Sequence, residues 1–231
     1  MAQSNRKIES QNPSDTSKAF PVKVDQILKT LSDTRAIAIL RKCPQSALSN
    51  VVAVLEQTGF RLVEITLDSI LPFDLIGEIS SKYSGVIVGA GTVHDVDQVQ
   101  AVAKSGGRFI VAPVISEEVI AESLESGLGI FPGAATPSEI AHAIGLGVTA
   151  VKVFPAQQLG GPSFIKAIMS PLLNPPLIPT GAVDIDNAAS YIEAGAIAVG
   201  VGSAVIQPKL IEAADFLGLE RLLNKLMKSI L

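Results

Sequence analysis

Several residue types are scarce in this 231-residue chain, and each shortage excludes a class of structure or function. Cys43 is the single cysteine, so an intrachain disulfide and a cysteine-built metal cluster are both excluded. The two histidines, His94 and His142, fall in segments typical of helices and belong to no spaced ligand motif, so we expect no metal site. The chain has no tryptophan and only 4% aromatic residues, which predicts an aliphatic core.

Positive charge and long apolar runs are also limited. The formal net charge of -4 argues against a general nucleic-acid binder, which would carry a basic surface. No apolar stretch is long enough to span a membrane. Together with the low cysteine content, these features predict a cytoplasmic protein without nucleic-acid or membrane partners.

The amino-terminal segment differs in composition from the rest of the chain. Residues 1–20 are polar, rich in Ser, Gln and Asn, and lack the apolar segment of a secretory signal. We therefore expect a flexible tail there. No linker divides residues 21–231, which predicts a single domain.

Hydrophobic residues are abundant, at 48% of the chain, and they occur in a regular alternation. Short apolar runs typical of buried strands alternate with amphipathic helical patterns, at intervals that leave room for one strand and one helix. The predicted strands cover residues 36–40, 62–66, 85–89, 109–112, 129–132, 150–154, 177–180 and 196–200. The predicted helices between them include residues 46–58, 95–104, 116–126 and 186–194.

Eight strand–helix units in succession predict an α/β fold, a closed (β/α)8 TIM barrel, with an additional helix over residues 24–31. Thr136 and Glu139 flank a proline at the first helical position, which is typical of a capping box. The alternative is a doubly wound open sheet. That fold usually shows a glycine fingerprint after its first strand, where this chain has Arg41 and Lys42 instead.

Lys152 is the most informative single residue, because it lies within a predicted buried strand. An ammonium group loses hydration there, which favours the neutral amine over the charged form. A neutral amine is a nucleophile that can attack a carbonyl carbon and form a Schiff base. The alternative is a structural lysine whose amine reaches water at the end of the strand.

Other polar residues lie at the predicted carboxyl ends of strands, where barrel enzymes carry their active sites. Glu64 and Thr66 end the second strand and point to the same face, Arg41 closes the first and Thr92 follows the third. If Glu64 and Lys152 both point inward, we expect them in the same or neighbouring layers of the barrel interior, on opposite walls. The alternative is a buried ion pair that only fills the barrel, which is weak evidence of stability.

Small residues follow the last two predicted strands. Thr180 and Gly181 come after the seventh, and the eighth runs into Gly200-Val201-Gly202-Ser203. Barrels often bind phosphate at these two loops through backbone N–H groups and a helix amino terminus. The alternative is that the glycines are present only for steric reasons.

Taken together, these segments resemble the KDPG (2-keto-3-deoxy-6-phosphogluconate) / 4-hydroxy-2-oxoglutarate aldolase family. The resemblance runs from about Arg35 to Ile206. The motifs that carry it are Val63-Glu64-Ile65-Thr66, Gly89-Ala90-Gly91-Thr92-Val93, Phe131-Pro132-Gly133, Val151-Lys152-Val153-Phe154-Pro155-Ala156, Pro179-Thr180-Gly181 and Val199-Gly200-Val201-Gly202-Ser203.

The resemblance implies a class I aldolase that cleaves a 2-keto-4-hydroxy acid reversibly into pyruvate and an aldehyde, without a cofactor or metal and as a homotrimer. By the same match, Lys152 is the Schiff-base lysine, Glu64 is the general acid/base acting through a water molecule, and Arg41 binds the carboxylate. The other residues that we expect to contact the small keto-acid substrate are Thr66, Thr92, Pro113, Phe154, Thr180, Gly181, Gly202 and Ser203.

Three residues depart from the family pattern. Asp68 stands where some members carry arginine, Ala182 where a second glycine is common, and Gln157 where glutamate is common. Residues 37–41 and 67–69 also look similar to the related 2-keto-3-deoxy-6-phosphogalactonate aldolases. That specificity is one alternative; the others are a non-catalytic barrel that binds a keto acid, and a metal-dependent or phosphate-binding barrel such as an isomerase.

Overall fold

The computed structural model describes residues 24–231, and the tail predicted over residues 1–20 lies outside this range. Strands and helices alternate along most of the described chain, as predicted. The strands are β1 Ala36–Leu40, β2 Leu62–Thr66, β3 Ile87–Gly91, β4 Phe109–Val111, β5 Gly129–Phe131, β6 Gly133–Ala134, β7 Val151–Val153, β8 Leu177–Pro179 and β9 Val199–Val201. The helices are α1 Val24–Thr34, α2 Gln45–Gln57, α3 Pro72–Lys82, α4 Val96–Lys104, α5 Glu117–Glu125, α6 Pro137–Gly145, α7 Gly161–Met169, α8 Ala188–Glu193, α9 Pro208–Glu212 and α10 Phe216–Ile230.

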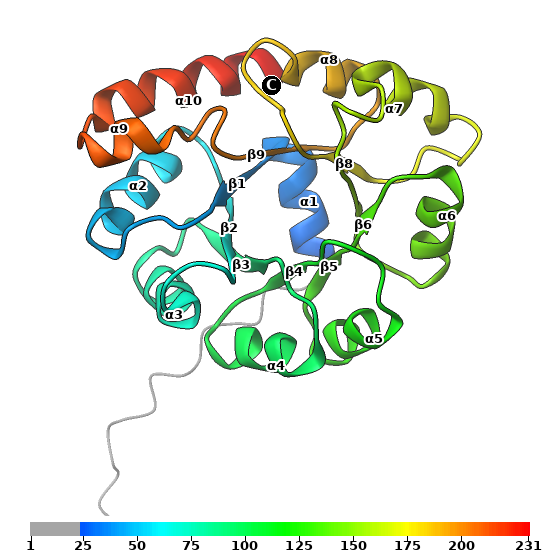
Figure 1. The fold of residues 1–231 in the computed structure, drawn as a ribbon, viewed down its shortest axis with the longest axis horizontal. Coiled ribbons are helices and arrows are strands. Elements are labelled where there is room, and N and C mark those ends of the chain that lie inside the picture. The colour runs from blue at the N-terminus through cyan, green and yellow to red at the C-terminus, as the bar shows by residue number, and fades with distance from the viewer. Residues whose placement is uncertain (1–23) are drawn as a thin grey trace, which may run out of the picture.

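The strands pair in parallel and form two sheets. One has the order β5-β4-β3-β2-β1-β9 and the other the order β6-β7-β8. An isolated parallel bridge between Thr180 and Gly200 links the two sheets, and Ile197 N donates to Leu177 O near it. Figure 1 shows the strands arranged around α1, with the other helices outside them. The fold is thus α/β with parallel sheets, and hydrogen bonding is not continuous through all the strands.

Each predicted strand has a counterpart, although two of them begin two or three residues later in the chain than expected. Gly85 belongs to the turn that ends α3, where Val86 N donates to Tyr83 O, so β3 starts at Ile87. Ala196 N donates to Tyr191 O in the turn that ends α8, so β9 starts only at Val199. In both cases the end of the helix takes the first residue that the sequence pattern assigned to the strand.

Side-chain caps begin several of the helices, and one predicted helix begins later than expected. The Thr136–Glu139 capping box is present, and the side chains of Asp95 and Ser116 cap α4 and α5. The helix predicted over residues 186–194 begins only at Ala188, because the Asp184 side chain accepts from the backbone N–H groups of the next turn.

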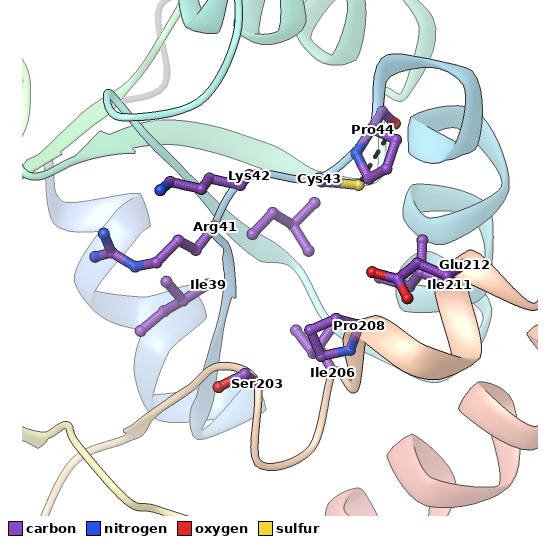
Figure 2. Close-up of a pocket in the computed structure, with 11 residues that line it drawn as sticks. Ile39, Arg41, Lys42, Cys43, Pro44, Ser203, Ile206, Pro208, Ile211 and Glu212 are labelled. Carbon is purple, nitrogen blue, oxygen red and sulfur yellow. Dashed lines mark hydrogen bonds between the residues drawn. The ribbon is translucent and has the colours of Figure 1, made fainter.

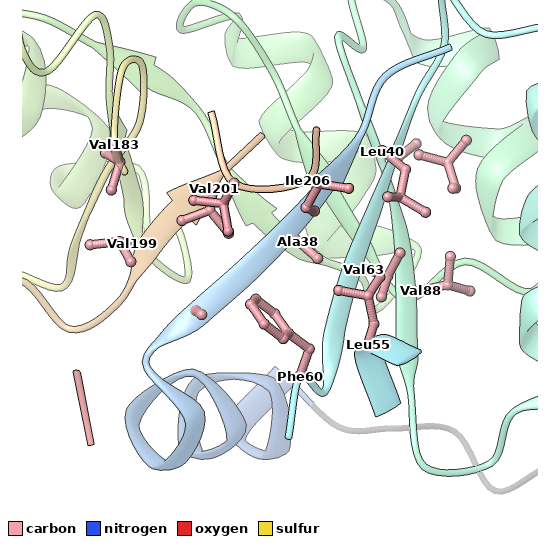
Figure 3. Packing of buried hydrophobic residues seen from close by; sticks show 14 of the residues in the cluster. Ala38, Leu40, Leu55, Phe60, Val63, Val88, Val183, Val199, Val201 and Ile206 are labelled. Atoms are coloured by element: carbon pink, nitrogen blue, oxygen red, sulfur yellow. The ribbon is translucent and has the colours of Figure 1, made fainter. Parts of the chain in front are cut away.

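Alternating strand residues divide the buried hydrophobic side chains into two cores. The outer core lies between strands and helices, and Figure 3 shows part of it, including Leu55, Phe60 and Val63. The interior core lies inside the ring of strands. Its members are Ile27, Leu31, Ile37, Leu62, Phe109, Val111, Phe131, Ala150, Ile178 and Ala198.

Helix α1 closes the amino-terminal end of the ring. Its Ile27 and Leu31 are completely buried in the interior core, beside residues that begin β2 and β4. The Phe109 and Phe131 rings pack there with centroids 5.4 Å apart. The polar residues predicted for the site are therefore left to the opposite end, where the strands finish.

Within residues 24–231, no helix is both long and apolar enough to cross a membrane.

Candidate active site

Glu64 and Lys152 face the same small cavity inside the ring of strands. Their neighbours Val63, Ile65, Val151 and Val153 all belong to the outer core, so strand alternation turns Glu64 and Lys152 to the interior. The cavity has a volume of about 10 Å³, close to the minimum that a single water molecule needs. It is lined by Ile37, Glu64, Val111, Phe131, Lys152, Ile178, Thr180 and Gly200.

The floor of this cavity is the interior core. Ile37, Val111, Phe131 and Ile178 belong both to the core and to the cavity lining. An apolar floor strengthens the electrostatic interactions of the few polar groups above it, because it keeps bulk water away.

Glu64 is only 2% exposed, and its carboxyl group forms no ion pair within 4 Å among residues 24–231. Burial raises the pKa of Glu64, and the nearby charges of Lys152 and Arg41 offset only part of that effect. Gly91, on the neighbouring strand, makes room for the side chain, since a Cβ atom there would collide with Glu64 Oε1. A carboxyl group with a raised pKa and a free cavity beside it is suited to giving and taking protons.

Lys152 is partly buried between two fully buried valines of β7. Its Nζ lies 5.4 Å from the centroid of the Phe154 ring, within range of a cation–π interaction. In the part of the chain that the structure describes, Lys152 forms no ion pair within 4 Å. Its amine is therefore held by weak contacts and is available to a ligand.

Arg41, Asp68 and Thr92 meet at the carboxyl ends of β1, β2 and β3, and we call them the mouth cluster. Arg41 Nη1 donates to Asp68 Oδ2 at 2.6 Å, and Arg41 Nη2 donates to Thr92 Oγ1 at 3.4 Å. Partial burial acts to raise the pKa of Asp68, but the Thr66 hydroxyl, the Arg41 guanidinium and the Lys42 charge together hold it below its usual value.

The backbone around the mouth is strained at three non-glycine residues. Lys42, Thr92 and Ala182 have φ angles of 53°, 64° and 54°, in the left-handed region that L-residues avoid. All three come just after strands, and such outliers gather at functional sites. Thr66, by contrast, is fully buried and its hydroxyl donates to Leu40 O at 3.4 Å, so it supports the strand ends from within.

The loops after β8 and β9 form the other side of the mouth. Thr180 lines the cavity, and Gly181 has a φ angle of +99°, with its Cα facing the Phe154 ring so closely that an added Cβ would lie 3.2 Å from it. The N–H groups of Ser203 and Ala204, which follow Gly202, have no hydrogen-bond acceptor in the described chain. These N–H groups are thus available to an anion.

A second cavity, of about 80 Å³, lies beside the mouth, and Figure 2 shows its lining. Arg41 and Ser203 line it and connect it to the mouth, while Ile206, Pro208 and Ile211 supply apolar walls. Cys43 also lines it. Burial raises the pKa of this thiol to about 11, so it is uncharged at neutral pH.

Pro113 and Phe154 lie on another side of the mouth. They line an open groove of about 470 Å³ together with Gly133 and Ala134, and Phe154 is 45% exposed. Phe154 also contacts Lys152, whereas Pro113 does not line the cavity of Glu64 and Lys152. Gln157 turns away toward α8, where its Oε1 accepts a hydrogen bond from Tyr191 Oη at 3.1 Å.

Sequence reasoning did not assign a role to Asp68 or Gly91. Asp68 follows Thr66 by two residues at a strand end, which is the signal that would have placed it beside Arg41. Gly91 lies inside a strand, and an interior glycine often marks a close approach of another group. No group of three or more His, Cys, Asp or Glu side chains among residues 24–231 is arranged to hold a metal ion.

Comparisons with known proteins agree on one family. The sequence model for the KDPG and KHG aldolases matches residues 24–222. A 2-dehydro-3-deoxy-phosphogluconate aldolase from Treponema pallidum is 34% identical over 158 residues, which are 68% of this chain and 75% of the relative. A 2-dehydro-3-deoxy-6-phosphogalactonate aldolase from Escherichia coli is 39% identical over 170 residues, which are 72% of this chain and 82% of the relative.

A solved structure described as native KDPGal has the same fold. It superposes with a TM-score of 0.78 at 32% identity, over 84% of this chain and 93% of that chain.

Proposed function

This chain belongs to the KDPG and KHG aldolase family, and on that premise we propose that it cleaves a 2-keto-4-hydroxy acid reversibly into pyruvate and an aldehyde. The substrates that fit the family are 2-dehydro-3-deoxy-6-phosphogluconate and 4-hydroxy-2-oxoglutarate, which give glyceraldehyde 3-phosphate or glyoxylate. The observation that carries the proposal is the pairing of Glu64 and Lys152 on one water-sized cavity above an apolar floor.

Lys152 is the nucleophile of this reaction. Its neutral amine attacks the C2 carbonyl, and loss of water gives an iminium ion. The iminium nitrogen accepts the electron pair of the C3–C4 bond as that bond breaks, which releases the aldehyde and leaves an enamine. Protonation of the enamine at C3 and hydrolysis of the iminium then release pyruvate and restore the amine.

Glu64 moves the protons. As a carboxylate it takes the proton of the C4 hydroxyl, and as a carboxylic acid it returns a proton to the enamine. The raised pKa of Glu64 suits both directions, because a group whose pKa lies closer to the working pH exchanges protons more readily. The cavity between Glu64 and Lys152 has room for one water molecule to relay the proton.

The mouth holds the rest of the substrate. Arg41 binds the keto-acid carboxylate through charge-assisted hydrogen bonds, with Thr92 beside it. Phe154 forms an apolar wall next to Lys152. The residues proposed to complete the pocket are Pro113 on one side and Thr180, Gly181, Gly202 and Ser203 at the distal end of the substrate. Thr66, which is fully buried, supports the strand ends that carry this pocket and does not itself contact the substrate.

A 2-dehydro-3-deoxy-6-phosphogalactonate substrate is the second candidate. The relative named as a 2-dehydro-3-deoxy-6-phosphogalactonate aldolase has 39% identity, and the one named as a 2-dehydro-3-deoxy-phosphogluconate aldolase has 34%. The two substrates differ in configuration at C4, where Glu64 acts, so the choice depends on how the mouth orients the C4 hydroxyl. A non-catalytic barrel that binds a keto acid is the remaining alternative.

Three further properties belong to this proposal. The two sheets act as one closed (β/α)8 barrel within a single domain of residues 21–231, supported by the Thr180–Gly200 bridge and by the direct succession of β5 and β6. The enzyme is cytoplasmic. It assembles as a homotrimer, which a mass measurement in solution tests.

Borohydride reduction in the presence of pyruvate tests the mechanism. We expect a covalent adduct that mass spectrometry locates on Lys152. The control variant is Lys166→Met, which removes an exposed lysine of α7 and should trap pyruvate normally. Absence of an adduct on Lys152 in the wild-type protein would contradict the mechanism.

A panel of substrates, scored by pyruvate release, identifies the substrate of an active enzyme. The panel contains 2-dehydro-3-deoxy-6-phosphogluconate, 2-dehydro-3-deoxy-6-phosphogalactonate and 4-hydroxy-2-oxoglutarate.

A further inference from the structure

Arg41 extends from the end of β1 with much of its side chain in solvent. Its side chain is 54% exposed, and an exposed arginine samples many rotamers. Two contacts hold the guanidinium here: Nη1 to Asp68 Oδ2 at 2.6 Å and Nη2 to Thr92 Oγ1 at 3.4 Å. Because the partners follow directly after β2 and β3, the guanidinium is held across three adjacent strand ends.

Asp68 is ionised at neutral pH. Its pKa is held below the usual value of an aspartate, so the carboxylate offers Arg41 a permanent negative charge. Lys42, the next residue in the chain, is fixed separately: its backbone N–H donates to Ser69 Oγ at 3.0 Å. The β2–α3 loop therefore holds both the side chain of Arg41 and the backbone that follows it.

Thr92 provides a second and independent observation that the position of Arg41 is important for function. Its φ angle of 64° is unfavourable for a β-branched residue, and glycine or asparagine would adopt it more easily. The threonine hydroxyl is the group that contacts Arg41. A strained residue whose side chain meets a site arginine is the pattern expected where local strain serves function.

We propose that Asp68 is a positioning residue, which holds Arg41 at the mouth so that its remaining N–H groups receive the carboxylate of the keto acid. A guanidinium carries more N–H donors than the two contacts use, so a ligand carboxylate can bind while Asp68 and Thr92 stay in place. This inference rests on the proposed function, because it concerns the same carboxylate.

The Asp68–Arg41 pair also limits which ligands bind at the mouth. Asp68 neutralises one positive charge, so Arg41 recognises a carboxylate by directed hydrogen bonds more than by an excess of positive charge. A keto acid should then be favoured over its uncharged ester through Arg41, and this preference should depend on Asp68. Substitution of a residue with only a structural role would change the binding of the keto acid and of its ester by the same factor.

Asp68→Asn tests this directly, with pyruvate and methyl pyruvate as probes in borohydride trapping. We expect the pyruvate concentration at half-maximal trapping to rise about fivefold, in the range of an ion pair of this exposure. The value for methyl pyruvate should not change, and neither should kcat at saturating keto acid. Asp74→Asn is the matched control, because it removes an exposed carboxylate from α3, which begins in the same loop region.

An Arg41→Ala background shows whether Asp68 acts through Arg41. In that background we expect Asp68→Asn to have no further effect on pyruvate, since two residues that work as one unit are not additive. Thr92→Gly should weaken pyruvate binding by a smaller factor and raise the midpoint of urea unfolding, which shows that the strain at residue 92 is relieved.

The outcomes separate the two hypotheses. An unchanged half-maximal concentration in Asp68→Asn, an equal shift for pyruvate and methyl pyruvate, or a full additional shift in the Arg41→Ala background would overturn the positioning role alone. Absence of any trapping in the wild-type protein would overturn the proposed function and the positioning role with it.

Discussion

The two ends of the space inside the ring of strands differ in almost every physical property. At the amino-terminal end, α1 places Ile27 and Leu31 against an interior core of apolar side chains that are close to fully buried. At the carboxyl end, Glu64 and Lys152 share a small cavity, and the mouth cluster holds Arg41. The first end contributes hydrophobic stabilisation, whereas the second buries the carboxyl group of Glu64, which forms no ion pair in the described chain.

This difference indicates that stability and chemistry are assigned to opposite ends of one interior. The ends are also in contact, because Ile37, Val111, Phe131 and Ile178 belong to both the core and the cavity floor. The apolar end therefore does more than stabilise: it supplies the rigid, dry surface on which the polar groups act. Variants at the two ends should separate activity from stability.

The largest effect is expected from Glu64→Gln at the carboxyl end. The substitution keeps the shape of the side chain but removes its proton transfer, so turnover should fall by about 10²–10⁴-fold with the fold intact. Steady-state cleavage of the keto acid measures it, with Glu78→Gln on α3 as the control. Full activity in Glu64→Gln would remove this residue from the mechanism.

Leu31→Ala at the amino-terminal end should have the opposite profile. Leu31 is completely buried between α1 and the strands, so its truncation should lower the free energy of unfolding by about 2–5 kcal/mol. Urea unfolding measures this change, and kcat at low temperature should be close to that of the wild type. Leu217→Ala, at a leucine that is 67% exposed, should change stability by less than about 0.5 kcal/mol. A large loss of kcat in folded Leu31→Ala would show that the two ends are not separable.

The raised pKa of Glu64 predicts how the carboxyl end affects stability as pH changes. Below the unfolded-state pKa of about 4.3 the group is protonated in both states and has no pH-dependent effect. As pH rises from there through the folded-state pKa, the Glu64 carboxyl group loses its proton in the unfolded state before it does so in the folded state. The free energy of unfolding therefore falls over this range of pH. Glu64→Gln should therefore gain stability relative to the wild type between pH 4 and pH 7, by about 1.4 kcal/mol for each unit of pKa shift. Unfolding titrations of both proteins at the two pH values measure the difference, and a constant difference would contradict a raised pKa.

Sequence alone predicted the apolar end less completely than the polar one. The strand that carries Lys152 and the helix over residues 24–31 were both visible as periodic patterns, and α1 extends three residues further, to Thr34. That α1 closes the ring depends on contacts between distant segments, which periodicity does not encode. At the carboxyl end, the strand positions of Glu64 and Lys152 predicted their common face, because alternation is a local property.

The contacts within the mouth cluster cannot all be predicted from local sequence patterns. Arg41 and Thr92 were expected at the site, but Asp68 was noted only as a departure from the family pattern. Its contact with Arg41 spans 27 residues of sequence and depends on the register between β1 and β2, in which Leu40 pairs with Ile65. The presence of Asp68, which departs from the family pattern, is explained by the positive charge of Arg41 at the end of the neighbouring strand.

The smallest effect is expected at Ala182, another departure from the family pattern. Its φ angle of 54° places an L-residue in the left-handed region, while its carbonyl oxygen accepts from Asn187 Nδ2 at 2.9 Å and fixes the turn. Ala182→Gly should relieve strain of about 1–2 kcal/mol, partly cancelled by the larger entropy of glycine in the unfolded chain. The net result should be a gain in stability of less than about 1 kcal/mol, whereas Ala121→Gly, at an exposed position of α5, should lose about 0.5–1 kcal/mol. Paired urea titrations measure both changes. Opposite signs at the two alanines would show that the carboxyl end stores backbone strain that a helix of the outer layer does not, and a loss at both would assign Ala182 to ordinary packing.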